Sequence, residues 1–140
     1  MAMSRNAAVV VFDGVAEWHV AIALASLRRY AGFRVLTIGF GHLPVLAESG
    51  LRVLPELTIG ECSLDGVDAL IVPGGELWER GPIATMTGFL HRASLMKTRI
   101  AAIGSGVVAV DPTNAITLRL ADGREISLPA RTTSLDHDGP

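Results

Sequence analysis

The sequence predicts a doubly wound α/β fold, in which a mostly parallel sheet is sandwiched between helices. Continuous apolar runs near 7–12, 34–39, 68–72 and 99–103 are typical of strands buried on both faces. Helical patterns and short connections separate several of these runs, which favours βαβ units. The chain has 140 residues, 49% of them hydrophobic, so one domain over 1–140 with its own core is expected.

The first predicted unit is strand, helix, strand. The strand at 7–12 is followed by a helix over 17–30, and Gly32 lies where a left-handed C-terminal cap would end it. The second strand follows at 34–39. Helical spacing predicts that four apolar side chains face the core: Trp18, Ile22, Ala25 and Leu27.

The middle of the chain predicts a small hairpin and then another buried strand. Two short extended pieces at 44–47 and 51–55 are joined through Ser49-Gly50. The strand at 68–72 ends directly in Pro73-Gly74-Gly75. A hairpin beside the main sheet and a glycine loop at a strand end are therefore expected.

A helix over 83–97 and a fourth sheet strand at 99–103 complete the predicted sandwich. Val107–Val110 opens a further helix that Asp111-Pro112 should stop within about one turn. The helix over 83–97 is predicted to point four side chains inward: Met86, Phe89, Leu90 and Leu95.

The C-terminal part of the chain predicts a β-hairpin. The alternating segments 116–120 and 124–128 flank Ala121-Asp122-Gly123, and an Asp-Gly pair suits a tight hairpin turn. The polar residues 131–140 are expected to fray.

Composition narrows the classes of function. The net charge is −2 and the 12 basic residues are scattered, which argues against a nucleic-acid surface. No apolar run reaches the roughly 18 residues that a membrane span needs. A single cysteine, Cys62, and an N-terminus without a signal-peptide pattern predict a cytoplasmic protein. The spacing of the histidines suggests no metal site, and no cofactor is expected.

The segment Ile100–Gly106 has the outline of a nucleophile elbow, a strand that turns sharply into a helix. Enzymes of that design place cysteine or serine at the turn, where backbone amides stabilise an anion. This chain has Gly104 at the turn and Ser105 after it. One interpretation is that the backbone amides of Gly104 and Ser105 still bind an anion although no nucleophile is present. The other is that the turn is a strained backbone position that favours glycine.

Four segments together resemble the ThiJ/PfpI superfamily. They are the first strand and turn (11–19), the internal hairpin (48–57), the strand with its Pro-Gly-Gly loop (68–75), and the strand into the elbow (100–103). The chain is identified on these motifs as a divergent member, over about 7–106. The resemblance implies a flavodoxin-like, class I glutamine amidotransferase-like fold, in a group that includes the parkinsonism-associated deglycase. It also implies a homodimer.

The chain departs from this superfamily at the positions that carry its chemistry. The elbow cysteine of the family aligns with Gly104, and the glutamate after the first-helix tryptophan aligns with His19. The family's histidine lies beyond the elbow, in a region that 111–140 does not resemble. A cysteine at the elbow becomes a nucleophile because amides and a helix N-terminus lower its pKa. Glycine offers only its amide.

Candidate functional residues gather around this turn. His19 and Ser105 are candidate catalytic groups, although the register of Ser105 should point its side chain away from the place of the missing cysteine. Glu76 and Trp78 are expected at the mouth of the site, and the second glycine of the family's loop contributes to an oxyanion hole. The predicted ligand-binding residues are His19, Gly74, Gly75, Glu76, Gly104 and Ser105.

Three functions are compatible with these residues. The first is a non-catalytic module that binds a small anionic metabolite or acts through dimerisation. The second is a cysteine-independent amidase, hydratase or lyase, with His19 as general acid or base. The third is a truncated or degenerate family member in which the divergent tail 111–140 has no function of its own.

Overall fold

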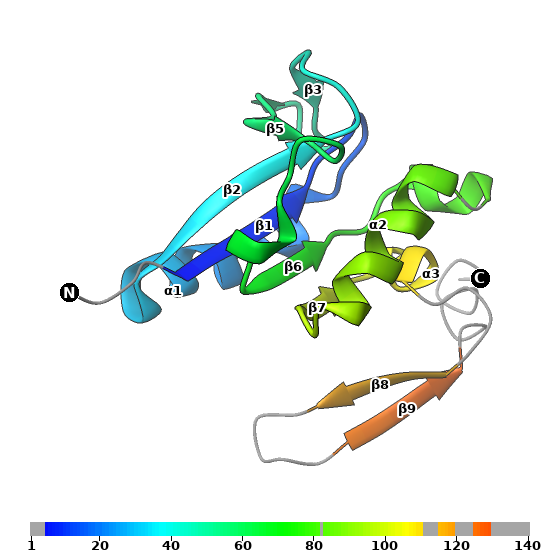
Figure 1. Cartoon of the computed structure of the whole chain (residues 1–140). Helices are drawn as coiled ribbons and strands as arrows, with labels where there is room; N and C mark the ends of the chain where they lie inside the picture. Colours follow the sequence, from blue (N-terminus) through cyan, green and yellow to red (C-terminus); the bar gives the residue numbers. More distant parts are fainter. Residues whose placement is uncertain (1–4, 82, 111–114, 120–124, 130–140) are drawn as a thin grey trace.

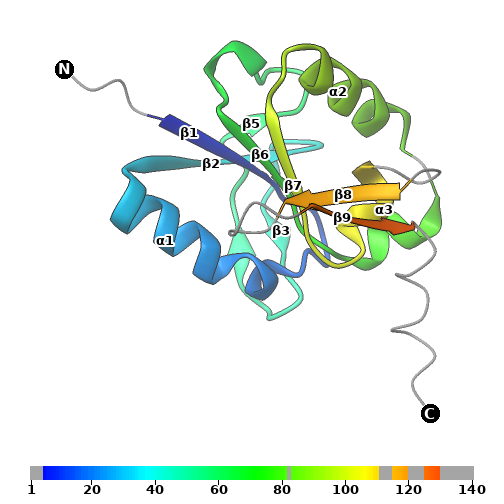
Figure 2. The same ribbon diagram turned by 90° about the horizontal axis from the view of Figure 1, so that it is seen from below.

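The computed structural model describes residues 5–81, 83–110, 115–119 and 125–129. Its centre is a five-stranded parallel sheet in the order β5-β2-β1-β6-β7 (Figures 1 and 2). The strands are β1 (Arg5–Val10), β2 (Phe33–Gly39), β5 (Leu57–Thr58), β6 (Ala69–Val72) and β7 (Arg99–Ala102). The doubly wound α/β fold predicted from the sequence is confirmed.

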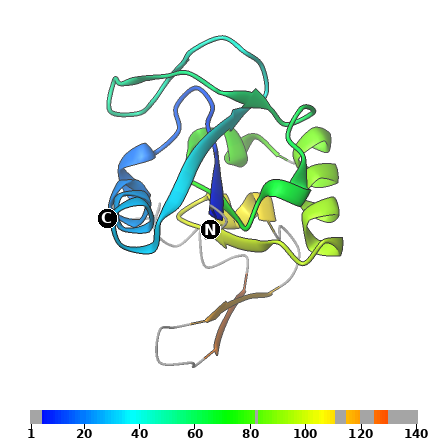
Figure 3. The ribbon, with the colours of Figure 1, turned by 60° about the vertical axis from the view of Figure 1, so that its left-hand side comes forward.

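Helices cover both faces of the sheet (Figure 3). Helix α1 (Ala21–Ala31) lies on one face, while α2 (Ala84–Leu95) and the short α3 (Gly106–Val110) lie on the other. Gly32 ends α1 in the left-handed conformation, with φ of 69°, as its position after the helix predicted. Three short 3₁₀ helices lie in the connections: η1 (Glu17–His19), η2 (Leu64–Gly66) and η3 (Glu76–Arg80).

Both predicted hairpins are present. Strands β3 (Val45–Leu46) and β4 (Arg52–Val53) pair antiparallel beside the sheet. Strands β8 (Ala115–Arg119) and β9 (Glu125–Pro129) form the second antiparallel pair (Figure 1). The Asp-Gly turn predicted for this second hairpin and the predicted fraying of 131–140 lie outside the described residues.

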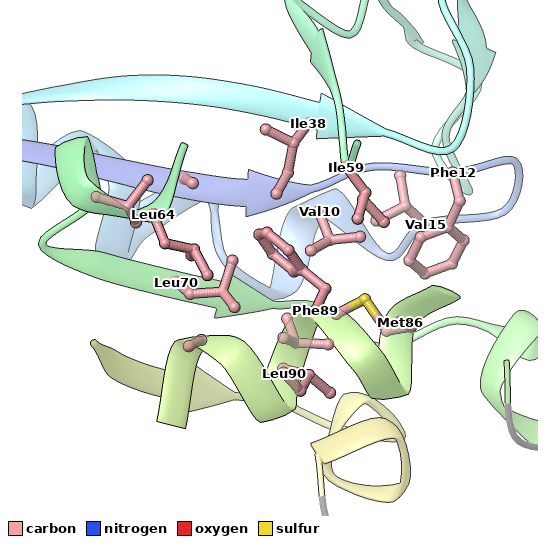
Figure 4. Packing of buried hydrophobic residues seen from close by; sticks show 14 of the residues in the cluster. Val10, Phe12, Val15, Ile38, Ile59, Leu64, Leu70, Met86, Phe89 and Leu90 are labelled. Atoms are coloured by element: carbon pink, nitrogen blue, oxygen red, sulfur yellow. The ribbon is translucent and has the colours of Figure 1, made fainter. Parts of the chain in front are cut away.

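The larger core lies between the sheet and α2. Phe89 and Met86 point from α2 toward Val10 and Leu70 on the strands (Figure 4). Phe89, Val10 and Leu70 are fully buried, and Met86 is 1% exposed. Burial of a side chain of this size contributes roughly 1.5–3 kcal/mol, so this contact layer anchors α2 to the sheet.

The structure corrects three details of the sequence prediction. The chain pairs a fifth strand, β5, with β2, where only four sheet strands were expected. The helix predicted over 17–30 is split into η1 and α1. Leu95 at the end of α2 is 70% exposed and does not face the core.

The core-facing side of α1 was also wrongly predicted. Trp18 is 56% exposed and Ile22 is 81% exposed. Ala25 is also exposed, whereas Leu27 packs on the sheet as predicted, together with Val20 and Leu24. Their i, i+4, i+7 spacing is an equally good helical stripe, and the break between η1 and α1 decides which stripe faces inward. Among the described residues, no helix has the length and apolar character needed to cross a membrane.

Candidate functional site

Three loops meet at the carboxyl ends of β1, β6 and β7. The Ala16 N–H donates to the Gly74 carbonyl at 2.9 Å. This hydrogen bond joins the loop after β1 to the loop after β6. The Glu48 N–H donates to the Val15 carbonyl at 2.9 Å and brings the β3–β4 hairpin alongside. Ligands of open α/β sheets bind at the carboxyl ends of the strands, so a binding site is expected where these loops meet.

A cavity of about 630 Å³ opens where these loops meet, and we call it the elbow cavity. Its lining contains five of the six residues predicted to bind a ligand; Gly74 is buried beside it. The residues that line the elbow cavity are Gly14, Ala16, Trp18, His19, Glu48, Gly75, Glu76, Glu79, Gly104 and Ser105.

Gly104 occupies the sharp turn between β7 and α3. Its φ is +60°, a left-handed conformation that side chains rarely adopt. A Cβ built on Gly104 would lie 3.2 Å from both Cε1 and Nδ1 of His19. The imidazole therefore covers the direction in which a nucleophilic side chain would start.

His19 combines a covered ring with an unsatisfied nitrogen. Its ring packs against the indole of Trp18, with centroids 3.9 Å apart and planes inclined by 59°. Among the described residues, the buried Nδ1 atom of His19 has no hydrogen-bond partner, and the same holds for Oε2 of Glu17. A buried polar atom without a partner costs free energy, so this corner of the site is less well satisfied than the rest of the loop.

The Ser105 side chain is held by the loop between β6 and η3. Its hydroxyl accepts a hydrogen bond from the Gly75 N–H at 2.9 Å and donates one to the Gly75 carbonyl at 3.0 Å. The hydroxyl thus faces Gly75, whereas a side chain at Gly104 would face His19. The Gly75 amide, which the family resemblance assigns to an anion hole, is already used within the protein.

The two loop glycines permit close approach of backbone segments. A Cβ on Gly74 would meet the Ser105 backbone nitrogen at 3.2 Å, and one on Gly75 would meet the Phe12 ring at 2.5 Å. Larger residues would push the loop away from the elbow and from β1. These distances indicate that glycine is needed here because the loop approaches the elbow closely.

Comparison with known proteins identifies the family. The model of the DJ-1/PfpI family matches residues 5–121. This chain belongs to the DJ-1/PfpI family. The match extends past the elbow to 121, farther than the 7–106 expected from the motifs.

Two curated relatives are similar over about half of this chain. A protein of Bacillus subtilis (strain 168) named as an uncharacterized protease is 30% identical over 82 residues, covering 54% of this chain and 39% of its own length. Drosophila melanogaster protein dj-1beta is 32% identical over 74 residues, covering 52% of this chain and 39% of its own length. The chain thus spans about two fifths of the length of these relatives.

Solved structures support the same fold. A DJ-1 superfamily protein from Agrobacterium tumefaciens has a TM-score of 0.66 at 22% identity, over 97% of this chain and 92% of that chain. Drosophila melanogaster DJ-1beta has a TM-score of 0.62 at 26% identity, over 79% of this chain and 58% of that chain. The described part of the chain therefore shares the DJ-1/PfpI fold.

Sequence reasoning misplaced two tryptophans around this DJ-1/PfpI site and missed other residues that line it. Trp78 is 3% exposed, donates its Nε1–H to the Pro73 carbonyl at 2.8 Å, and packs edge-on against Phe12, so it belongs to the core. Trp18, predicted for the core, lines the elbow cavity instead. Glu48 was missed because only the tertiary fold brings the β3–β4 hairpin to this mouth, and Glu79 because no motif marked it, although it shares η3 with the predicted Glu76.

Cys62, the cysteine of this chain, lies away from the turn at Gly104. It packs against the main core in the loop after β5 and is absent from the lining of the elbow cavity. Burial raises the pKa of the Cys62 thiol, which keeps it protonated at neutral pH. Within the described residues, no group of three or more His, Cys, Asp or Glu side chains could hold a metal ion.

We expect iodoacetamide to alkylate Cys62 in the native protein more slowly than it alkylates free cysteine near neutral pH. The thiolate is the reactive form, and the raised pKa makes it scarce. Mass spectrometry over a time course measures the rate, and the urea-unfolded chain serves as the control that should react like a free thiol. Native labelling as fast as the unfolded control would contradict this interpretation of Cys62.

Proposed function

We propose that this DJ-1/PfpI domain is a non-catalytic module that binds a small ligand in the elbow cavity. The observation that carries the proposal is Gly104: the turn is kept, with its φ of +60°, but it bears no attacking atom. The cavity of about 630 Å³ beside it remains open. A domain that retains a shaped site without its nucleophile is suited to binding rather than turnover.

The hydrogen bonds of Ser105 support the same function. A serine nucleophile needs a base within hydrogen-bond reach, and the Ser105 hydroxyl instead donates to the Gly75 carbonyl at 3.0 Å. A carbonyl oxygen does not accept a proton at neutral pH. The role of Ser105 is thus better explained as structural: its hydroxyl holds the loop after β6 against the turn at Gly104. The homodimer expected from the sequence stays a prediction.

A cysteine-independent hydrolase or lyase is the second candidate, and one observation favours it. The Nδ1 atom of His19 is buried at the cavity and lacks a partner among the described residues. A neutral imidazole in that position could accept a proton from a bound substrate. His19 would then be a general base that acts without a covalent intermediate.

Turnover assays separate these two functions. We expect no hydrolysis or hydration above background with amides, glyoxals or isocyanides between mildly acidic and mildly basic pH. The reason is that the site lacks a nucleophile at the elbow. Product formation is followed by NMR, with His19→Asn as the matched variant and His91→Asn, on the exposed side of α2, as its control.

A rate that survives Cys62→Ser but disappears in His19→Asn, while His91→Asn keeps it, would overturn the non-catalytic proposal. It would also establish His19 as the acting group. A bell-shaped dependence of that rate on pH would point to an acid and base pair. Equal background rates in all variants are the expected result.

A further inference from the structure

We propose that the edge of the sheet where its strands begin binds a single-stranded nucleic acid. This inference goes beyond the proposed function, because the elbow cavity lies at the opposite, carboxyl edge of the sheet. It departs from the expectation drawn from the sequence, in which scattered basic residues argued against a nucleic-acid surface. The fold brings together basic residues that are far apart in the chain.

Basic residues collect at the amino edge of the sheet. Strands β1, β2, β6 and β7 run parallel and begin at this edge, and α1 and α2 end beside it, directly before β2 and β7 (Figure 1). Six of the nine lysine and arginine residues between 5 and 110 lie there, and we call them the basic edge: Arg5, Arg28, Arg29, Arg34, Lys97 and Arg99.

The charges of the basic edge are open to an anionic partner. All six side chains are exposed, and within the described part of the chain none of them forms a salt bridge. The described carboxylates at this edge are those of Asp65 and Asp68, which come just before β6. Six positive charges therefore meet two negative ones here, although the whole chain carries a net charge of −2.

Helix dipoles explain only part of this arrangement. Arg28 and Arg29 lie in the last turn of α1, where a positive charge stabilises the helix end. Arg5, Arg34 and Arg99 instead lie at the starts of strands, and strands have only small net dipoles. These three arginines thus have no structural partner that accounts for them, and a bound anion would supply one.

A groove beside the basic edge gives room for an unstacked base. It has a volume of about 680 Å³, and its lining comes from α1 and β2 and includes Arg28 and Arg34. Phe33 and Val35 add apolar surface, and Glu56 is the acidic member of the lining. Two arginines beside an apolar wall suit a nucleotide, because its phosphate is anionic and its base is flat and largely apolar on its faces.

The outer side of β2 adds backbone hydrogen-bonding groups to this groove. Strand β5 pairs with β2 at Ile38 and Gly39, so within the described residues no strand pairs with the outer side of β2 from Phe33 to Leu36. An edge strand presents unpaired N–H and C=O groups there. Such groups can bind the hydrogen-bonding edges of a base that is not paired with another strand.

Two aromatic rings among the arginines favour a single strand over a duplex. Tyr30 is 80% exposed in the last turn of α1, and the Arg29 guanidinium carbon lies 5.6 Å from the centroid of its ring. The guanidinium carbon of Arg5 lies 5.9 Å from the centroid of the Phe33 ring. Proteins that bind single strands combine a positive groove with rings on which bases stack. In a duplex the base faces are covered, so Tyr30 could not stack on them.

Fluorescence anisotropy with labelled oligonucleotides tests the inference on the full chain. The probes are oligo(U) and oligo(dT), each about 12 nucleotides long, at a salt concentration of about 0.05 M. We expect both to bind, and the tighter one to identify RNA or DNA as the source of the ligand. Contact with about four phosphates predicts a loss of affinity of about fiftyfold between about 0.05 M and about 0.2 M salt.

The double substitution Arg5→Gln/Arg34→Gln is the first variant. It should weaken binding about tenfold at about 0.05 M salt and reduce the slope of log affinity against log salt by about 1.4. Arg52→Gln/Arg80→Gln is the matched control, since it removes the same charge from two exposed residues away from the basic edge. It should leave the affinity nearly unchanged. Far-UV circular dichroism verifies that each variant is folded.

Tyr30→Ala separates base stacking from charge attraction. Loss of the ring should weaken binding about tenfold and leave the salt slope as it is, because no charge is removed. Trp18→Ala is its control, since Trp18 is an exposed aromatic residue at the opposite edge of the sheet. This control should bind as the unchanged protein does.

Several results would overturn the inference. One is the failure of both oligonucleotides to bind at about 0.05 M salt. Another is equal weakening by the two double substitutions, which would mean that only net charge matters. Tighter binding to a duplex of the same length, to heparin or to phosphatidylserine vesicles would assign the basic edge to another polyanion. None of these results bears on the elbow cavity, so the proposed function is tested separately.

Discussion

Gly106→Ala is expected to destabilise the fold strongly, because the new methyl group would collide with backbone atoms. Gly106 is buried at the start of α3, and a Cβ there would overlap the Val72 carbonyl oxygen and lie 2.8 Å from the Pro73 carbonyl oxygen. Backbone at the end of β6 cannot rotate away as a side chain can. We expect a loss of at least about 3 kcal/mol, which is a large part of a typical domain's stability.

Urea denaturation followed by circular dichroism measures this loss in the free energy of unfolding. Gly66→Ala is the matched control, since a Cβ on Gly66 meets nothing within 4 Å. It should change stability by no more than about 0.5 kcal/mol. A Gly106→Ala protein as stable as the control would show that β6 and α3 do not pack as closely as described.

Phe89→Ala should have the second-largest effect. The Phe89 side chain is fully buried between α2 and the sheet, where it packs in one cluster with Val10 and Leu70. Truncation removes its transfer free energy and leaves a cavity, at a cost of about 3–5 kcal/mol. The melting temperature and the urea midpoint should both fall sharply.

Leu95→Ala on the same helix is the control for this prediction. Leu95 is 70% exposed, so its truncation removes little buried apolar surface. The substitution should therefore lower the free energy of unfolding by about 0.5 kcal/mol or less. The pair also tests which side of α2 faces the sheet, with Phe89 inward and Leu95 outward. Comparable losses from Phe89→Ala and Leu95→Ala would mean that the helix is rotated relative to the described packing.

The strands of the sheet could be predicted from the sequence because most of them are buried on both faces. Parallel strands such as β1 and β6 form unbroken apolar runs, and no alternation has to be resolved to find them. The two-residue strand β5 was missed because Leu57–Thr58 has no such run. Leu57–Thr58 becomes a strand because it pairs in parallel with the end of β2, on the side away from β1.

The orientation of α1 shows where periodicity fails. Both Trp18–Ile22–Ala25 and Val20–Leu24–Leu27 are apolar stripes at helical spacing. Only the turn η1, which separates Trp18 from the helix proper, decides that the second stripe meets the sheet. A local pattern cannot report a rotation that is set by packing.

The sequence by itself determined the α/β class, the DJ-1/PfpI motifs, and the glycine where the family elbow has a cysteine. These are properties of local runs and of single positions. The tertiary structure decided which groups meet at the site. It placed the His19 ring beside Gly104 and gave the Gly75 N–H a hydrogen bond to the Ser105 hydroxyl. It also brought Glu48 and Glu76 to the lining of the same cavity. Such contacts join residues far apart in the chain, so no spacing in the sequence encodes them.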